Sequence, residues 1–555
     1  MTDREHYEAV VVGCGPGGAA AAARLADHGV ETLVLERGVD AGSKNVSGGL
    51  LYAEQSAPYT IDDLFEDFRE EASERPITDY HMDNLAGGKV KSYDLTRLHE
   101  NDTEWCDAVL RRKMDSWLAE RVHEKCRETG GGLLTEVRVN GLLRENGEII
   151  GVTCDELDDI EADVVIAADG VNSELARDAG LMDWEDPEEY FQGVKAVVDL
   201  PEGHVEDEFD VGEDEGVARL FSGDLFEGVR GGGFMYTNQD TLSIGTVFHL
   251  DSLAAERAEP HELLDALLTH PYLARWLPEE YVELEYSAKL VPDSKKAALS
   301  NPHRDRLLVV GDAAGQMQAQ GPIIKGMNHA VSAGALAADA FVTARGRSGT
   351  TAGQRYTEML QHEGIMEKLK PRAYRASRRL SERDAVSDLV DTVATSAVGR
   401  FVLKRGVSEK LVGRAFNSPT MMAMLPDIRT AYVTLPSLIG EVQGLPVGGE
   451  SHVEPPSLEE RIGDLTYDTD VGNPHIVVND ESYEASGTAV TACPVSAEGF
   501  GGGCYRSETV KRNGSEERVV SLDTQPCVEC GTCAVVADTT WEHPRGGKGV
   551  EFKQG

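Results

Sequence analysis

The sequence predicts an α/β fold in which a Rossmann-like domain is interleaved with an antiparallel-sheet domain and followed by a small cysteine-containing domain. Residues 7–36 read as strand, glycine turn, helix and strand, which is a βαβ unit. Residues 190–290 alternate apolar and polar side chains between Gly-rich turns, as antiparallel strands do. Three cysteines crowd together within residues 527–533, which is typical of a small metal-binding module.

Two further strands and two helices follow from short local patterns. Asp163–Ala167 and Arg306–Val310 are apolar runs, and we expect each to be a buried strand of the first domain. Residues 105–128 carry the helical spacing of apolar side chains, and residues 327–345 are Ala-rich and are predicted to form another helix.

The domain boundaries follow the same patterns. We expect residues 1–175 and 295–345 to form the dinucleotide-binding domain, with the sheet domain at 176–294 inserted between them. A helical region is expected at 346–450, ending in a stretch punctuated by Pro and Gly. The cysteine domain is expected at 470–555.

The charge balance excludes one class of partner. The chain of 555 residues holds 97 Asp and Glu against 53 Lys and Arg, a formal net charge of −44. A field of that sign repels phosphate backbones, so no nucleic acid is expected as a partner. The acidic residues are dispersed, which indicates a solvated acidic surface and a salt-adapted source.

The sequence also predicts where the protein resides. No run of about 18 apolar residues is present, so no membrane-spanning helix is expected. The acidic N-terminus enters a strand at once and does not read as a signal peptide, which predicts a cytoplasmic protein. Nine cysteines in a reducing compartment favour metal or redox chemistry over disulfides.

A dinucleotide fingerprint lies between the first strand and the first helix. Gly13 permits the tight turn, Gly15 lets a pyrophosphate approach the backbone, and Gly18 lets the helix pack on the sheet. Glu36 follows at the end of the second strand, where a carboxylate holds a ribose hydroxyl. Because strand, helix and acid are in register, we interpret this as a dinucleotide site rather than a Gly-rich turn.

Two later motifs favour FAD over NAD. Asp169 and Gly170 follow one buried strand, and Gly311 and Asp312 follow another and open a helix. A carboxylate at the carboxyl end of a strand can bind the ribityl chain of FAD. Each motif alone would be an ordinary turn, but their order after the fingerprint predicts FAD.

The cysteine pattern predicts one 4Fe–4S cluster. Cys527, Cys530 and Cys533 form a CxxCxxC run whose short loops let three thiolates converge. Cys493, which a proline follows, is the expected fourth ligand. Cys504 is the alternative fourth ligand, and a zinc site built from four cysteines is the alternative metal.

Several runs resemble the FixC branch of the electron-transfer flavoprotein:quinone oxidoreductase family, which belongs to the geranylgeranyl reductase superfamily. The resemblance covers nearly the whole chain, and it is carried by the runs Glu36–Gly49, Leu110–Leu118, Tyr286–Ala288, Gly311–Gly315 and Pro322–Gly326.

This resemblance implies further site residues. Arg37, Arg111 and Gly326 lie in the matching runs and are expected to help bind FAD. Gly231 and Gly232 are similar to the family's quinone-contacting segment on a strand. Glycines there would leave room for a flat ring.

The C-terminal module resembles FixX, a ferredoxin-like 4Fe–4S domain. The shared features are the Cys-Pro pair, the CxxCxxC run, and Trp541 followed by Pro544–Gly547. The resemblance implies a reduced electron-transfer flavoprotein, of FixAB type, as electron donor and a membrane quinone as acceptor. It further implies a peripheral enzyme on the inner face of the cell membrane, for which Phe416–Leu445 is a candidate lipid-contacting stretch.

Two other functions stay open on the sequence. The superfamily contains geranylgeranyl reductases, which act on prenyl lipids. A FixCX-like relay subunit of an electron-bifurcating complex is the other alternative. The fused cysteine module favours the quinone oxidoreductase over the lipid reductase.

Overall fold

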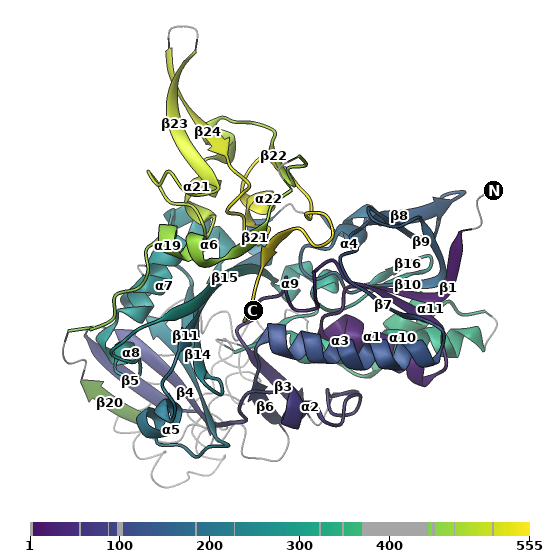
Figure 1. Ribbon diagram of the computed structural model, residues 1–555, viewed down its shortest axis with the longest axis horizontal. Coiled ribbons are helices and arrows are strands. Elements are labelled where there is room, and N and C mark those ends of the chain that lie inside the picture. The colour runs from purple at the N-terminus through teal and green to yellow at the C-terminus, as the bar shows by residue number, and fades with distance from the viewer. Residues whose placement is uncertain are drawn as a thin grey trace, which may run out of the picture.

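Figure 1 shows the computed structural model, with a helix-covered sheet, a second sheet and a smaller C-terminal module at the top of the view. The structure describes residues 4–54, 57–86, 88–96, 104–183, 186–226, 228–320, 323–346, 349–368, 442–446, 450–470, 472–512 and 515–555.

The first sheet carries the predicted βαβ unit. Its strands β1 (Glu5–Val12), β2 (Thr32–Leu35), β10 (Ile160–Ala167) and β17 (Leu307–Val309) are parallel, in the order β17-β10-β1-β2. Helix α1 (Pro16–Asp27) connects β1 to β2. The order is that of a dinucleotide-binding sheet, which confirms the predicted α/β fold.

Both faces of this sheet are buried, which explains the unbroken apolar runs. Ala9 and Val11 of β1 face the core beneath the helices, whereas Val10 and Val12 face the opposite core. The helical layer contains α1, α3 (Arg111–Glu128) and α10 (Met327–Arg345). The opposite layer contains β8 (Val139–Glu145), β9 (Glu148–Cys154) and α4 (Glu174–Asp178).

One helix is shorter than its sequence pattern indicates. Helix α10 spans the predicted range, but α3 begins only at Arg111 because Leu110 has an extended backbone. The preceding residues form β6 (Glu104–Ala108), which pairs with β3 (Leu50–Glu54). The first residues of the predicted helix therefore form a strand, because they pair with the distant strand β3.

The second sheet has eight strands and draws on more of the chain than expected. Its order is β15 (Glu283–Pro292), β11 (Tyr190–Asp199), β14 (Thr241–His249), β13 (Gly231–Thr237), β12 (Gly216–Gly223), β4 (Ile77–Ala86), β5 (Lys89–Asp94) and β20 (Val442–Pro446). The first five strands are antiparallel, as predicted. However, β4 pairs with β12 in parallel, and β4, β5 and β20 come from outside residues 176–294.

The expected helical region is described only in part. Helices α11 (Ala352–His362) and α12 (Ile365–Lys368) lie at its start. The short segment 442–446 is the edge strand β20, not a helix, because it pairs with β5. Most of the candidate lipid-contacting stretch Phe416–Leu445 lies outside the described residues.

The C-terminal module is built from short elements around the cysteines. They are α19 (Leu458–Asp464), β21 (Thr466–Asp468), β22 (Ile476–Val478), α20 (Tyr483–Ser486), α21 (Thr488–Ala492), β23 (Tyr505–Arg512), β24 (Ser515–Leu522), α22 (Thr532–Val536), β25 (Thr539–Trp541) and β26 (Gly549–Glu551). Strands β23 and β24 form a hairpin that projects at the top of Figure 1. The module shares one apolar core with the second sheet.

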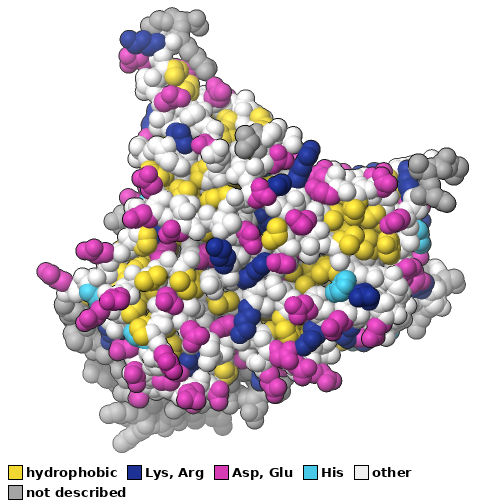
Figure 2. Space-filling model, viewed as in Figure 1, with side chains coloured by type: hydrophobic (Ala, Val, Ile, Leu, Met, Phe, Trp, Pro, Cys, Tyr) yellow, Lys and Arg dark blue, Asp and Glu magenta, His cyan; other side chains and the backbone are white. Residues whose placement is uncertain are grey.

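The surface is acidic throughout the face in view. Figure 2 shows Asp and Glu side chains scattered over all three parts, with Lys and Arg interspersed. Among the described residues, no helix has both the length and the apolar character needed to cross a membrane.

Candidate functional site

Two glycines of the fingerprint are required by close backbone contacts. Gly13 has a φ of +91°, and a Cβ there would lie 2.5 Å from the carbonyl oxygen of Ala168. A Cβ on Gly18 would lie 1.9 Å from the carbonyl oxygen of Gly13. The turn after β1 and the entry of α1 therefore need glycine at both positions.

Gly15 faces side chains rather than backbone. A Cβ there would lie 3.2 Å from Nη2 of Arg111 and 3.7 Å from Nδ2 of Asn45. Arg111 is held by Asp115, whose Oδ2 lies 2.6 Å from the same Nη2. The N-terminus of α1 and a guanidinium thus lie at one place, which suits a pyrophosphate.

Glu36 lies against the glycine loop, as the fingerprint requires. Its Oε2 accepts from the backbone N–H of Cys14 at 2.9 Å, and its Oε1 accepts from that of Gly38 at 2.8 Å. A carboxylate has about four acceptor positions, so a ribose hydroxyl can still donate to it.

Asp169 has a structural partner at the end of β10. Its carboxylate accepts from the Ser173 hydroxyl at 2.7 Å and from the Leu175 N–H at 3.2 Å, which caps the start of α4. Burial raises the pKa of Asp169 to about 6, against these hydrogen bonds. Gly170, with a φ of +77°, has open space where a Cβ would sit. The loop therefore leaves room for a ligand beside Gly170.

Asp312 is the carboxylate most available to a cofactor. It follows β17 in a short 3-10 helix that opens at Gly311, and Gly326 at the start of α10 lies close to it. Burial raises the pKa of Asp312, while Arg111 and Lys289 oppose the shift. Within the described ranges its carboxylate has no hydrogen-bond partner. A hydroxyl donor of the cofactor would satisfy it, so the residues present fit FAD.

Arg37 is turned toward the cysteine module. Its Nη1 lies 2.7 Å from Oε2 of Glu529, inside the CxxCxxC run. Its expected contact with FAD stays a prediction.

All the cysteines of the module come together in one buried cluster. Their side chains are at most 8% exposed, and they are Cys493, Cys504, Cys527, Cys530 and Cys533. The thiol of Cys504 is hydrogen-bonded to those of Cys493 and Cys527. The hydrogen bond from Cys504 is the largest cause that lowers the pKa of Cys527, to about 5. Both candidate fourth ligands thus lie at the site, and the choice between them stays a prediction.

The surroundings of the cysteines suit a thiolate-bound metal group. The backbone N–H of Glu529 donates to Sγ of Cys527 at 3.3 Å, and Cys530 and Thr532 are hydrogen-bonded at 3.4 Å. Gln192 donates in turn to the Thr532 hydroxyl at 2.7 Å. Thiolates are the ligands of both iron–sulfur clusters and zinc, so the donor set fits either group.

Comparison with known proteins identifies the flavin half. A family model described as "FAD binding domain" matches residues 6–359. FixC of Escherichia coli (strain K12) is 36% identical over 358 residues, which span 64% of this chain and 81% of that protein. The chain belongs to the FixC family. The protein is therefore a FAD-dependent oxidoreductase, and the binding of FAD at the glycine loop stays a prediction.

Further comparisons agree with this. YdiS of the same strain, named a probable electron transfer flavoprotein-quinone oxidoreductase, is 34% identical over 370 residues, covering 66% of this chain and 83% of YdiS. A geranylgeranyl bacteriochlorophyll reductase-like protein from Thermoplasma acidophilum shares the fold, with a TM-score of 0.57 and 21% identity over 76% of this chain and 99% of that one.

The glycines expected at the quinone lie within β13 of this FixC-family protein. A Cβ on Gly231 would lie 2.2 Å from the carbonyl oxygen of Val247, and one on Gly232 would lie 2.5 Å from that of Phe221. Neighbouring strands thus take the space that we expected a ring to fill. The role of Gly231 and Gly232 in quinone binding stays a prediction.

A buried aromatic cluster, which includes Phe234 and Tyr236 of the same strand, was missed from the sequence. Tyr80, Tyr93, Phe234 and Tyr236 lie on the face of the second sheet that turns to β3 and β6, and Tyr52 of β3 belongs to the same cluster. Gly48, in the segment that precedes β3, lies beside this cluster, since a Cβ added there would be 3.5 Å from the Tyr236 ring. No single sequence run indicates this cluster, because its side chains come from three separate segments.

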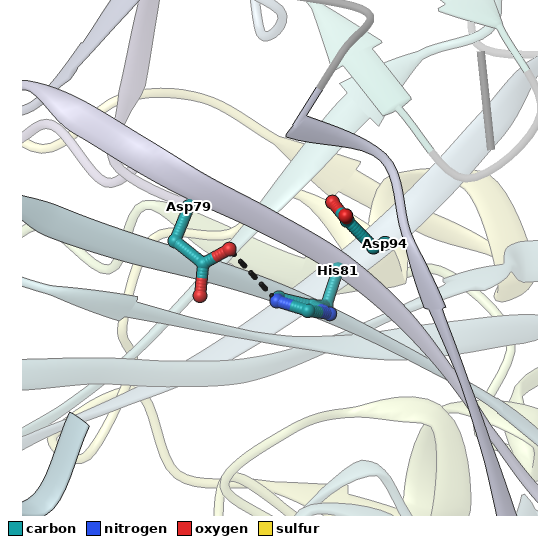
Figure 3. A group of neighbouring side chains, drawn as sticks. All are labelled: Asp79, His81 and Asp94. Carbon is teal, nitrogen blue, oxygen red and sulfur yellow. Dashed lines mark hydrogen bonds and ion pairs between the residues drawn. The ribbon is translucent and has the colours of Figure 1, made fainter. Parts of the chain in front are cut away.

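One polar group lies on the other face of the second sheet. Figure 3 shows Asp79 and His81 on β4 and Asp94 on β5, with Oδ1 of Asp79 at 2.8 Å from Nε2 of His81. Their ligand atoms lie within 4.8 Å of one another. Thr96 donates to both carboxylates, and Ser92 lies 3.4 Å from the second nitrogen of His81. The protein's own hydrogen bonds therefore account for this group.

Proposed function

We propose that this protein passes electrons from a reduced electron-transfer flavoprotein, through a 4Fe–4S cluster and FAD, to a membrane quinone. The observation that carries the proposal is the contact between the two sites. Glu529 and Cys530 of the cysteine loop are bonded to Arg37 and Asn172 of the flavin domain. Two redox sites in direct contact suit an enzyme that relays electrons.

We infer the residues that would hold each group from the sequence motifs, and the geometry of the glycine loop and of the cysteine cluster supports the inference. FAD would be held by Gly13, Gly15, Gly18, Glu36, Arg37, Arg111, Asp169, Gly170, Gly311, Asp312 and Gly326. A 4Fe–4S cluster would be held by Cys493, Cys527, Cys530 and Cys533. FAD exchanges electrons singly or in pairs and the cluster exchanges one at a time, so together they convert single electrons into a two-electron product.

Donor and acceptor are inferred from the relatives. YdiS carries both partners in its name, and this chain is 34% identical to it. The quinone would reach the flavin beside the buried aromatic cluster or at Gly231 and Gly232. We place the protein in the cytoplasm, peripheral on the inner face of the cell membrane.

The test is an anaerobic assay on the purified protein. Iron, sulfide, zinc and FAD are measured first, with four iron atoms and one FAD per chain expected. Reduced electron-transfer flavoprotein and a short-chain quinone are then supplied, and quinol formation is followed. Stoichiometric zinc without iron would refute the cluster. If quinol forms only with NADH and with co-purifying flavoprotein subunits, the result favours the relay subunit. If a prenyl lipid is reduced instead of the quinone, the result favours the lipid reductase.

A further inference from the structure

Asn172 lies between the two sites and belongs to neither motif. It follows Asp169 and Gly170 in the loop after β10, and its side chain is 1% exposed. Its Nδ2 donates to the carbonyl oxygens of Glu529 and Cys530, at 3.3 Å each. One side chain of the flavin domain is therefore bonded to two successive peptides of the cysteine loop.

The cysteine loop is shaped to receive this side chain. Gly531 has a φ of +89°, and a Cβ there would lie 2.4 Å from Oδ1 of Asn172. Any other residue would push the loop away from Asn172. On the flavin side, Nη2 of Arg177 donates to the backbone carbonyl of Asn172 at 3.3 Å, which holds the asparagine in place.

Each of these two carbonyl oxygens accepts one further hydrogen bond of similar length. Nζ of Lys289 donates to the Glu529 carbonyl at 3.3 Å, and the N–H of Leu290 donates to the Cys530 carbonyl at 3.4 Å. The Asn172 amide thus supplies the only side-chain bond to the Cys530 carbonyl in the part of the chain that the structure describes. Its removal would leave a buried carbonyl weakly satisfied, and the loop would shift to compensate.

We propose that Asn172 is a positioning residue that holds the Cys530 loop against the flavin site and so sets the distance for electron exchange. The inference rests on the proposed function. The step is a one-electron exchange in which one site is oxidised and the other reduced, with no bond made or broken. Its rate falls steeply with the separation of the two sites, so a small displacement of the loop slows it.

The first experiment compares Asn172→Ala with the wild-type holoprotein. FAD content, iron content, the EPR spectrum of the reduced cluster and the rate of internal electron exchange after rapid reduction are measured. We expect FAD to remain bound and the exchange to slow about tenfold, as for other residues that orient metal ligands from outside. Asn140→Ala is the matched control, because Asn140 is exposed on β8 and bonds to Thr153 on β9 and to Asp155 just after it.

The second experiment tests the contact itself through Gly531→Ala, alone and combined with Asn172→Ala. The added methyl should displace the loop when Asn172 is present, and less when Asn172 is truncated, so the two effects should not add. Strictly additive effects would overturn the contact.

The outcomes separate the two proposals. Wild-type protein without iron and sulfide refutes the proposed function, and this inference with it. Wild-type protein with both cofactors and an unchanged exchange rate in Asn172→Ala refutes only the role of Asn172. Iron lost from Asn172→Ala with FAD retained supports the positioning role, because Cys530 is itself a candidate ligand.

Discussion

Nη1 of Arg37 lies 2.7 Å from Oε2 of Glu529, and the Glu529 side chain is only 1% exposed. The other carboxylate oxygen accepts from Nζ of Lys44 at 3.3 Å and from the N–H of Val550 at 2.9 Å. Burial opposes ionisation of this carboxyl, but Arg37 and Lys44 outweigh it and lower the pKa of Glu529 to about 2. A residue between two cysteines is thus the anion that ties the C-terminal module to the flavin domain.

The first prediction concerns this carboxylate. Glu529→Gln keeps the shape of the side chain but leaves the part-buried Arg37 and the buried Lys44 without their counter-charge. We expect a loss of about 3–5 kcal/mol in the free energy of unfolding, measured with urea. The control is Asp27→Asn, which breaks an exposed ion pair with Lys125 of 2.7 Å. That change should cost about 1 kcal/mol or less, and equal losses in the two variants would contradict the buried-pair argument.

Local patterns predicted the flavin domain well. Apolar spacing and turn residues predict the βαβ unit, α10 and the glycine loop. These signals lie within a few positions of one another, so they can be recognised in the sequence directly. The second sheet was only partly predictable. The parallel pairing of β4 with β12 joins segments about 140 residues apart, and no local pattern marks it.

The contacts between the two sites could not be predicted for the same reason. Arg37 and Glu529 are 492 positions apart, and Asn172 and Cys530 are 358 apart. Glu529 also has a φ of +53°, which nothing in its residue type indicates. The sequence does show the five cysteines of the module, but it does not show whether Cys493 or Cys504 is the fourth ligand.

The second prediction concerns the phosphate loop. A valine at Gly15 places its side chain toward Arg111 and Asn45, where the pyrophosphate is expected. Gly15→Val should therefore purify without flavin, measured by absorbance and by release of FAD. Gly463→Val is the control, since that exposed glycine has open space around it. Full flavin in Gly15→Val would show that the phosphate loop lies elsewhere.

The third prediction concerns the hydrogen bonds between Glu285 and the backbone of residues 553–555. The two oxygens of this carboxylate accept the backbone N–H groups of Lys553, Gln554 and Gly555, at 2.5, 3.0 and 2.7 Å. The backbone N–H of Arg111 in turn donates to the Gly555 carbonyl at 3.4 Å, beside the phosphate loop.

Glu285→Gln replaces one acceptor oxygen by a donor, so at least one of these bonds is lost. We expect FAD to dissociate about tenfold faster, as one charge-assisted bond of about 1.5 kcal/mol would give. The rate is followed by flavin fluorescence after dilution. The control is Glu148→Gln, because Glu148 is an exposed residue of β9. An unchanged rate would contradict the coupling of residues 553–555 to the FAD site through Arg111.

The fourth prediction is a pH dependence set by Asp107. This carboxyl is 2% exposed, and burial raises its pKa from 3.8 to about 7, although Arg69 opposes the shift. Between these values the folded protein keeps the proton and the unfolded chain releases it, so stability falls as pH rises. In the wild-type protein the free energy of unfolding should therefore decrease by an amount on the order of 3 kcal/mol between pH 4 and pH 7. In Asp107→Asn this decrease should be absent. Parallel stability curves for the two proteins would refute it.

The last prediction separates the two candidate fourth ligands. A thiolate that binds iron cannot be replaced by serine without weakening the cluster, whereas a bystander thiol can. We expect Cys493→Ser to lose or alter the cluster's EPR signal and iron content, and Cys504→Ser to leave both largely intact.

FAD should stay bound in both variants, because its loop lies in the other domain. Cys504 contacts both Cys493 and Cys527, so its removal tests whether proximity alone makes a ligand. If Cys504→Ser is the variant that loses iron, the Cys-Pro assignment is wrong. The loop from Gly499 to Cys504 would then supply the fourth thiolate, and Cys493 would be the bystander packed beside it.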